Sequence, residues 1–298
     1  MTELMRIAKH FNIKSIKNDR KYWLFRAVDL CSFKEFYDNQ YIAFDSSSIF
    51  ETGDEYLDIF INGMKENDIV VTVDPESSEI IIGEILDKGS IETGDLRKYR
   101  RMKWLKYISI DSLDIYLHKL LNTNDKIVNA DEYSRYIDRS IYDFYIKDNN
   151  AHILFEVKAK KNISAINLLK FIASVVSIVD IYNEIFEDNL DKSKIELQIN
   201  VQSPGPIEFF GDIEVVLLVG IILVIIVGGR IRFEKSTNKS SGEIETEGLL
   251  EKIMKFYKLV KNNELDSDKK KWKKTLEESI DALELKKPET LFEEEKEK

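Results

Sequence analysis

The segment from Val215 to Gly229 constrains the fold of this chain more than any other, because its 15 residues carry no charged side chain. Its sequence is VVLLVGIILVIIVGG, in which β-branched residues dominate. As a helix it would span roughly 22 Å, whereas the hydrocarbon core of a bilayer is about 30 Å thick. Three interpretations stay open: a short membrane span, a buried helix or a strand pair broken at Gly220, and a helix buried by oligomerisation.

The charges that flank this segment disfavour the membrane span. Asp212 and Glu214 precede it, and Arg230 and Arg232 follow it. The positive-inside rule would place its C-terminal side in the cytoplasm and export the larger N-terminal half.

The first residues, MTELMRIAKHF, lack the basic-then-apolar pattern of a secretory signal. A lone cysteine, Cys31, excludes an internal disulfide and fits a reducing cytoplasm. We expect a cytoplasmic protein, with membrane association as an alternative.

The overall charge limits the kind of ligand. The 298 residues carry a formal net charge of -10, which argues against a protein that coats nucleic acid through its whole surface. Any nucleic-acid contact must therefore be confined to a local basic patch.

Such a patch lies within residues 67–108. Two β-rich runs, Ile69–Val73 and Ile80–Ile85, are joined by a polar turn and predict a β-hairpin. Gly83 in the second run indicates a bulge or a close backbone approach. The cluster Tyr99–Trp104 (YRRMKW) follows, and its cations and aromatic rings suit phosphate neutralisation and base stacking.

The spacing of short strands and helices predicts two domains and a tail. Residues 1–128 contain many short strands and two interposed helices, including one at 54–65, and favour a small, partly closed β-barrel over 18–125. Residues 129–285 predict an α/β unit that contains a helix at 131–146, a long helix at 164–186, the apolar segment 213–229 and two C-terminal helices. Residues 286–298 form a charged tail that we expect to be disordered.

The order of motifs in the first domain resembles a known family. It consists of a YWLFRA strand at 22–27, an aromatic strand end at Phe44 and Asp45, a helix, NDIVV at 67–71, IGEI at 82–85 and RMKWL at 101–105. This order resembles the PUA/EVE-like module at the N-terminus of some Mrr-type restriction endonucleases and related defence proteins. Asn67 replaces the usual glycine of the turn, and asparagine tolerates the positive φ that this turn needs.

The resemblance implies a barrel with a pocket for a base, including a modified base, flipped from its duplex. The matching base-binding positions are Trp23, Arg26, Phe44, Asp45 and Trp104, and the candidate phosphate contacts are Arg100, Arg101 and Lys103. Each position has a structural alternative. The tryptophans can be core residues, Arg26 and Asp45 can pair with each other, and the arginines can solvate a strand edge.

A second candidate site follows the strand His152–Phe155, which ends in Glu156-Val157-Lys158. An apolar strand ending in Glu-x-Lys is half of the PD-(D/E)xK nuclease signature, in which two carboxylates hold Mg²⁺. Asp148 or Asp143 would supply the other carboxylate. The run Lys269–Lys274 (KKKWKK) can also contact nucleic acid or lipid, although such a run is more often the solvated face of a helix.

Together these features predict an α+β protein, with a PUA/EVE-like β-barrel followed by an α/β unit. The favoured function is recognition of nucleic acid, in a prokaryotic defence or related setting, coupled to a C-terminal effector or oligomerisation unit. A binding protein without cofactor is favoured over an enzyme. The alternatives are a Mg²⁺-dependent nuclease using Glu156 and Lys158, and a membrane-associated or homo-oligomeric interaction protein.

Overall fold

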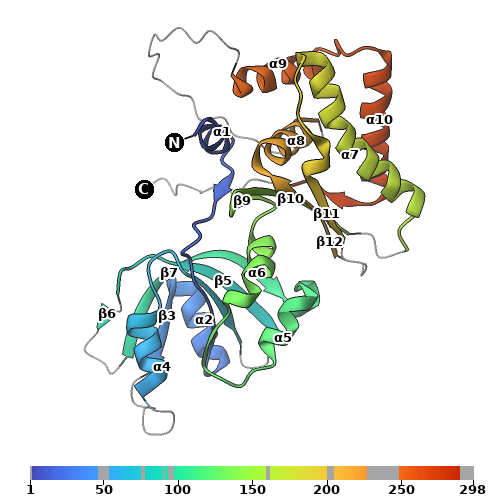
Figure 1. Cartoon of the computed structure of the whole chain (residues 1–298). Coiled ribbons are helices and arrows are strands. Elements are labelled where there is room, and N and C mark those ends of the chain that lie inside the picture. Colours follow the sequence, from blue (N-terminus) through green and yellow to red (C-terminus); the bar gives the residue numbers. More distant parts are fainter. Residues whose placement is uncertain are drawn as a thin grey trace. The chain divides into compact units, whose positions relative to one another are not determined.

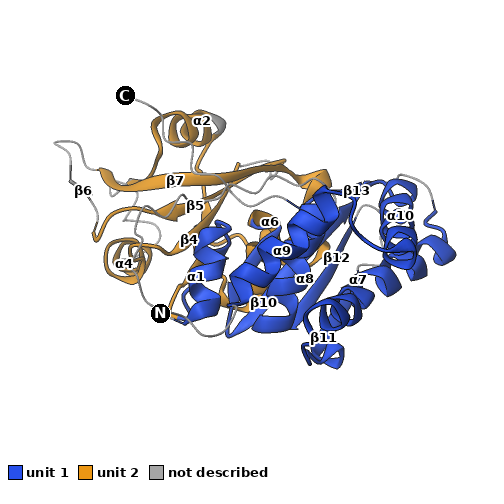
Figure 2. Ribbon diagram, turned by 90° about the horizontal axis from the view of Figure 1, so that it is seen from above, with its two compact units in different colours: residues 1–18, 142–298 blue, residues 19–141 orange. Residues whose placement is uncertain are grey.

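A computed structural model describes residues 2–45, 54–74, 78–89, 91–92, 97–158, 162–199, 205–226 and 248–288. The chain forms two compact units (Figure 2), named unit 1 (residues 1–18 and 142–298) and unit 2 (residues 19–141). Both combine helices with β-sheet, so the predicted α+β class is confirmed. The units differ from the predicted domains at two places. Helix α1 (Glu3–His10) belongs to unit 1, because Ile7 and Ala8 pack into its core, and unit 2 extends to Ile141.

Unit 2 is built on one curved sheet (Figure 1) with the strand order β3-β7-β5-β4-β2-β8. Its strands are β2 (Tyr22–Arg26), β3 (Tyr41–Asp45), β4 (Ile69–Val73), β5 (Glu79–Ile85), β7 (Arg97–Ser109) and β8 (Ile127–Asn129), and the short β6 (Ile91–Glu92) also pairs with β7. The β2–β4 pair is parallel and the other pairs are antiparallel. The predicted hairpin is confirmed as β4–β5, whose β-branched residues are all buried.

Short helices connect the strands of unit 2. They are α2 (Leu30–Asn39), α4 (Asp54–Asp58) continued by the π-helix η2 (Ile59–Gly63), the 3-10 turns η3 (Ile110–Ser112) and η4 (Ile115–Leu117), α5 (His118–Leu121), η5 (Asp131–Tyr133) and α6 (Ser134–Ile141). Helix α2 was not predicted. The Asp29 carboxylate caps it by accepting a hydrogen bond from Ser32 N, and Gln40 ends it in the left-handed conformation at φ 57°.

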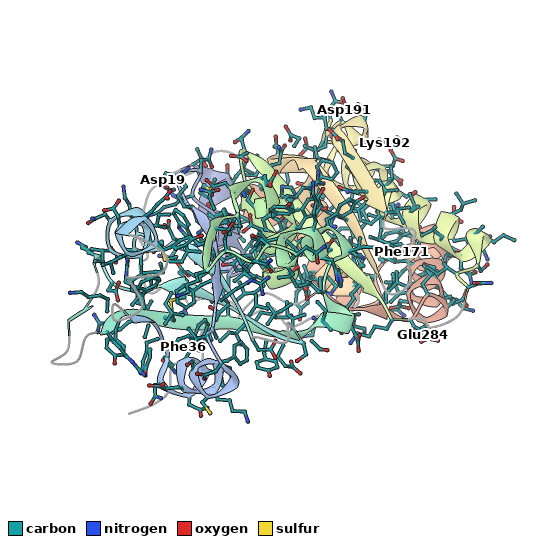
Figure 3. All side chains as sticks on the ribbon, turned by 90° about the horizontal axis from the view of Figure 1, so that it is seen from below. Asp19, Phe36, Phe171, Asp191, Lys192 and Glu284 are labelled. Atoms are coloured by element: carbon teal, nitrogen blue, oxygen red, sulfur yellow. The ribbon has the colours of Figure 1, made fainter. Side chains whose placement is uncertain are left out.

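One face of the unit 2 sheet carries an aromatic core. Helix α2 and the α4–η2 segment contribute Phe33, Phe36 and Phe60, which pack against Phe25 and Phe44 of the sheet. Figure 3 labels Phe36 in this core, together with Phe171 in the core of unit 1.

Unit 1 contains a second sheet, with the order β1-β9-β10-β12-β11. Its strands are β1 (Lys14–Ser15), β9 (Phe144–Lys147), β10 (Asn150–Val157), β11 (Ile195–Ile199) and β12 (Gly205–Asp212), and β13 (Leu285–Lys286) also pairs with β10. Asp148 and Asn149 form the β9–β10 turn with φ values of 49° and 62°, as a two-residue hairpin requires. The helix predicted for 131–146 therefore ends at Ile141, because its last residues form β9.

The helices of unit 1 follow its hairpins. Hairpin β9–β10 leads to α7 (Ala165–Phe186), and η6 (Lys192–Lys194) with hairpin β11–β12 leads to α8 (Ile213–Ile226). Helices α9 (Leu249–Lys261) and α10 (Ser267–Ala282) complete the unit and confirm the two predicted C-terminal helices. Lys286, which the predicted tail includes, lies in β13 opposite Glu156.

Helix α8 accounts for most of the apolar segment. It contacts β10, β12, α1, α7 and α9, and 12 of its 14 residues are buried in the core of unit 1. A Cβ added to Gly220 would lie 2.4 Å from Phe144 Cζ, so the missing side chain makes room for this ring. A helix covered on all sides must be apolar all round. Of the open interpretations, the structure therefore shows the buried helix for residues 213–226, and residues 227–229 lie outside the described residues.

Helix α7 is the described helix that has the length and apolar composition of a membrane span. A core helix has the same properties, and α7 buries Phe171, Val175 and Ile178 in the core of unit 1. Membrane association thus stays a prediction.

Candidate nucleic-acid interface

Strand β7 concentrates positive charge within this acidic chain. Its 13 residues, RKYRRMKWLKYIS, contain six arginines and lysines and no acidic residue. Arg101 is exposed, and Lys103 and Lys106 are half-buried. Arg97 and Arg100 form ion pairs with Glu35 and Asp87. The candidates on β7 for a contact with phosphate groups are therefore Arg101, Lys103 and Lys106.

The pairing of β7 with β5 divides the predicted cluster between two faces. Alternate residues of a strand point to opposite sides, so Arg101 and Lys103 lie on one face while Met102 and Trp104 lie on the other. Gly83 lies opposite Trp104 and Ile82 opposite Lys106, which leaves Leu105 as an extra residue and confirms the predicted bulge.

This bulge fixes the members of each face. Lys106 joins Arg101 and Lys103 on a cationic face, and Tyr107 joins Trp104 on an aromatic face. The prediction of a single mixed patch was wrong in this respect, because the strand period separates neighbours in sequence.

Arg100 is not available to phosphates. Its side chain is fully buried, Nε donates to Asp87 Oδ1 at 2.6 Å, and Nη1 donates to the carbonyl oxygens of Phe60 and Met64 at 2.9 Å each. The planar guanidinium carries several donors in a fixed geometry, which suits it to join β7 to the end of η2. The predicted phosphate contact at Arg100 was therefore wrong.

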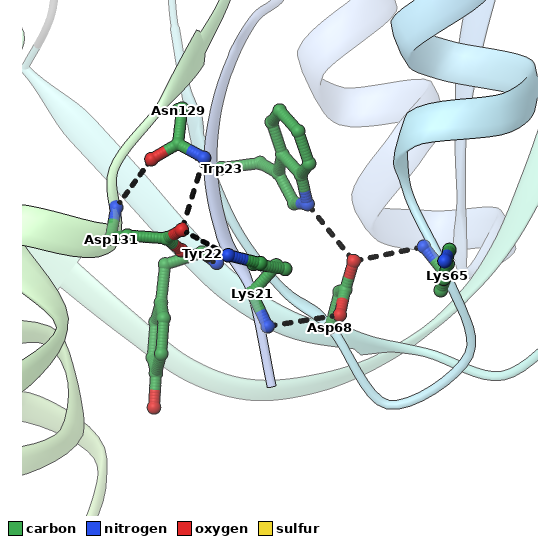
Figure 4. Close-up of polar contacts among 7 residues, drawn as sticks. All are labelled: Lys21, Tyr22, Trp23, Lys65, Asp68, Asn129 and Asp131. Carbon is green, nitrogen blue, oxygen red and sulfur yellow. Dashed lines mark hydrogen bonds and ion pairs between the residues drawn. The ribbon is translucent and has the colours of Figure 1, made fainter. Parts of the chain in front are cut away.

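Trp23 and Phe44 lie in the core, with 8% and 5% of their surfaces exposed. Trp23 Nε1 donates to Asp68 Oδ2 at 3.0 Å, and the same carboxylate accepts hydrogen bonds from Lys21 N and Lys65 N (Figure 4). Asn67 precedes Asp68 with φ 72°, so asparagine does replace glycine in this turn as expected. Trp23 and Phe44 are therefore core residues in this structure, as the structural alternative proposed.

Trp104 differs from Trp23 because it is only half-buried. Its Nε1 donates to the Phe36 carbonyl of α2 at 3.1 Å. Its ring lies against Gly83, where an added Cβ would be 2.5 Å from Trp104 Cε3, which confirms the predicted close approach. Of the three aromatic residues predicted to bind a base, Trp104 is the one whose ring reaches the surface.

The remaining base-binding candidates have other environments. The Arg26 guanidinium donates to the Leu121 carbonyl, and burial lowers the pKa of Arg26. Asp45 forms the last pair of β3, opposite Arg97, but its side chain lies outside the described residues. An Arg26–Asp45 pair therefore stays a prediction.

Two exposed tyrosines, which were not predicted, extend the aromatic face. Tyr37 of α2 is 45% exposed and Tyr107 is 50% exposed, and their rings meet edge to face with centroids 5.5 Å apart. Partial burial and the nearby Glu79 carboxylate raise the pKa of Tyr107. Gly83, which predicts a bulge in this pair of strands, is the sequence signal that would have placed Tyr107 beside Trp104.

One of the two carboxylates predicted for the nuclease site lies far from Glu156. Glu156 and Lys158 are exposed at one end of β10, whereas Asp148 lies in the turn at the other end. The six residue steps from Asn150 to Glu156 extend roughly 20 Å, which is too far for two ligands of one metal ion. The predicted pairing of Asp148 with Glu156 was therefore wrong.

The other predicted carboxylate, Asp143, lies at the same end of β10 as Glu156, because its backbone carbonyl accepts a hydrogen bond from Leu154 N and its partner Lys286 pairs with Glu156. A shared role of Asp143 and Glu156 stays a prediction. Asp143 accepts a hydrogen bond from Lys286 Nζ at 3.1 Å. Among the described residues, no group of three or more histidine, cysteine or acidic side chains has the arrangement of a metal site.

Comparisons with known proteins give limited similarity. No protein-family model and no curated protein matches the chain. Among solved structures, the Mmi1 YTH domain aligns with a TM-score of 0.29 and 13% identity, over 40% of this chain and 94% of that one. A structure of the YTH domain-containing protein Mmi1 with RNA gives a TM-score of 0.28 and 13% identity, over 44% of this chain and 85% of that one. Similarity at this level does not assign the chain to a family.

Proposed function

We propose that unit 2 binds single-stranded nucleic acid along β7. The observation that carries the proposal is the concentration of Arg101, Lys103 and Lys106 on one face of a strand that contains no carboxylate, in an acidic protein. Lysine and arginine attract the phosphate backbone, and exposed aromatic rings stack on bases of any sequence.

One edge of β7 brings the two faces within reach of the same ligand. Strand β3 pairs with β7 only at residues 97–101. Beyond Arg101, in the part of the chain that the structure describes, no strand covers this edge of β7. A nucleic-acid strand that follows the edge can contact Lys103 and Lys106 from one face and Trp104 and Tyr107 from the other.

The finer proposal of modified-base recognition centres on Trp104. Since Trp23 and Phe44 are buried, a base would stack on the exposed side of Trp104 in this conformation and would not lie between all three rings. The defence setting and the coupled effector stay predictions of the family resemblance alone.

Fluorescence anisotropy with labelled single-stranded RNA, single-stranded DNA and duplex DNA tests the proposal. In a variant that combines Arg101→Glu and Lys106→Glu, we expect the affinity for single strands to fall about tenfold or more. The slope of log K against log salt should fall by about 1.4, because each phosphate contact contributes about 0.7 for single strands.

The matched control combines Lys270→Glu and Lys271→Glu, two exposed positions on α10, and changes the net charge equally. This control should retain at least half of the affinity. Absence of binding by the wild-type protein, or an equal loss in the two double variants, would contradict the proposal.

A further inference from the structure

Strand β11 is an open edge of the unit 1 sheet. It pairs with β12 on one side, and no other described strand pairs with it. Alternate residues of β11 therefore direct their backbone N–H and C=O groups away from the sheet. Soluble proteins often protect such edges with lysine, proline or a bulge, and the five residues of β11, IELQI, have none of these. An edge of this kind is a template for a further strand.

A stripe of apolar residues on α7 lies beside this edge. Leu169, Ile172 and Val176 are three and four residues apart and so share one side of the helix. Asp180 lies one turn beyond Val176 in the same stripe, and its carboxylate pairs with Lys192 Nζ at 2.8 Å. Since Lys192 belongs to η6, directly before β11, the stripe faces the side of α7 on which β11 lies.

The edge and the stripe expose apolar side chains on the same face of the sheet. Leu197 of β11 pairs with Phe209 of β12, and the Phe209 ring contacts Phe171 of α7 with centroids 5.8 Å apart. Leu197 therefore points to the face that α7 covers. It is nevertheless 39% exposed, and Leu169 of the stripe is 66% exposed. A partner strand at the edge would cover both.

The occupant that this surface fits is a second copy of the same chain. In an antiparallel pairing of two β11 strands centred on Leu197, Glu196 of each copy lies opposite Gln198 of the other, so no like charges meet. The same register sets Ile195 opposite Ile199 and Leu197 opposite its own counterpart, which are apolar cross-strand pairs. A parallel pairing in register would instead set Glu196 opposite Glu196.

This pairing also accounts for the stripe on α7. Opposite residues of an antiparallel pair point to the same face, so the α7 helices of the two copies lie on one face of the joined sheet. The two-fold axis makes these helices antiparallel and directs the stripe of each copy toward the other. The stripe is then buried between the two copies.

We infer that β11 and the apolar stripe of α7 (Leu169, Ile172 and Val176) form an isologous dimer interface, in which the sheets of two copies of unit 1 join through an antiparallel β11–β11 pair. This interface is independent of the nucleic-acid binding proposed for β7. It also differs from oligomerisation through the apolar segment, which α8 buries inside unit 1.

Sedimentation velocity of the full chain over a concentration series tests the interface. The wild-type protein should be dimeric at about 100 μM and dissociate on dilution, since small interfaces bind weakly. Leu197→Lys opposes two like charges at the two-fold axis and should raise the dissociation constant about tenfold or more. Leu169→Glu, on the stripe, should weaken the dimer as well. Val28→Lys, which adds a charge at an exposed apolar position of unit 2, should leave the dimer unchanged.

Charge complementation tests the register. Because Leu197 faces its own counterpart, the Leu197→Lys and Leu197→Glu variants should each be monomeric, and a mixture of the two should form a heterodimer. The far-UV circular dichroism of each variant should match that of the wild-type protein. A wild-type protein that stays monomeric, or a dimer that persists in both Leu197→Lys and Leu169→Glu, would overturn the inference. A mixture of the two Leu197 variants that stays monomeric would overturn the pairing centred on Leu197.

Discussion

Two basic runs of this chain each contain a tryptophan, and their environments differ. Tyr99–Trp104 in β7 and Lys269–Lys274 in α10 each combine at least three cations with a tryptophan. On α10 the lysines meet carboxylates. Lys269 Nζ lies 2.7 Å from Glu184 Oε1, and Lys273 and Lys274 face Glu277 and Glu278 one turn later. On β7 the cations have no acidic residue in their own strand, and Arg97 and Arg100 pair with Glu35 and Asp87 from outside it.

The difference shows why secondary structure decides what a basic run can do. A helix places residues four apart side by side, so a lysine run followed by glutamates neutralises itself. A strand instead sends neighbours in sequence to opposite faces, so residues next to each other in a basic run do not lie side by side. The run on α10 is therefore a solvated helix face, as its structural alternative proposed, whereas on β7 the residues Arg101, Lys103 and Lys106 share one face of the strand.

The largest expected difference is in the free energy of unfolding when the buried cation of each run is removed. Arg100→Ala should lower the free energy of unfolding by about 3–5 kcal/mol, because it leaves Asp87 buried without its partner. Lys269→Ala should cost about 1 kcal/mol or less, since its partners Glu184 and Asp266 are mostly exposed. Urea denaturation of both variants measures the difference. Equal losses would show that the two buried cations have equivalent structural roles.

The next effect concerns the glycine that positions Trp104. Gly83→Ala should cost about 1–3 kcal/mol, because the new methyl group would overlap the Trp104 ring. Gly89→Ala is the matched control, since an added Cβ there meets nothing within 4 Å. Thermal unfolding measures the cost, and near-UV circular dichroism reports the displaced indole. An unchanged spectrum in Gly83→Ala would mean that Trp104 does not depend on Gly83 for its position.

The local features that could be predicted from the sequence are those that one element determines by itself. The β4–β5 hairpin, the turn at Asn67, the bulge at Gly83 and helix α7 follow from β-branched runs, turn residues and apolar spacing. Helix α2 was missed because only two residues separate its cap, Asp29, from the end of β2.

The candidate site was harder to predict because it depends on pairing. The burial of Arg100 requires η2 to lie beside β7, and the exposure of Trp104 depends on α2. The separation of Asp148 from Glu156 depends on the position of the β9–β10 turn. The sequence analysis grouped residues that are close in sequence. Strand pairing and register determine which of these residues lie together in the structure.

A smaller effect distinguishes the two tryptophans by function. Trp104 Nε1 donates to the Phe36 carbonyl and Trp272 Nε1 to the Ser174 carbonyl, in each case from a half-buried ring. Each Trp→Phe variant should lose about 1 kcal/mol of stability, the usual net value of one hydrogen bond. Only Trp104→Phe should also weaken binding to single-stranded oligonucleotides, by a few-fold, because phenylalanine is a smaller stacking surface. Equal binding by the two variants would remove Trp104 from the interface.

The smallest effect is a pH dependence confined to α10. The Lys269 ammonium and then the Lys269 backbone N–H hydrogen-bond to Asp266 and lower the pKa of that carboxyl. A lowered pKa in the folded state stabilises the first turn above the unfolded value of about 3.9, and this stabilisation is lost as the pH falls through the lowered value. The helical ¹³Cα shift of Lys269 should therefore decrease on acidification. Asp266→Asn keeps a good capping residue and should remove the pH dependence. The control lies in β7, which has no acidic residue, so the ¹³Cα shifts of Arg101 and Lys103 should not change over this titration. A matching change at Arg101 and Lys103 would mean that acid affects the whole fold and not the α10 cap alone.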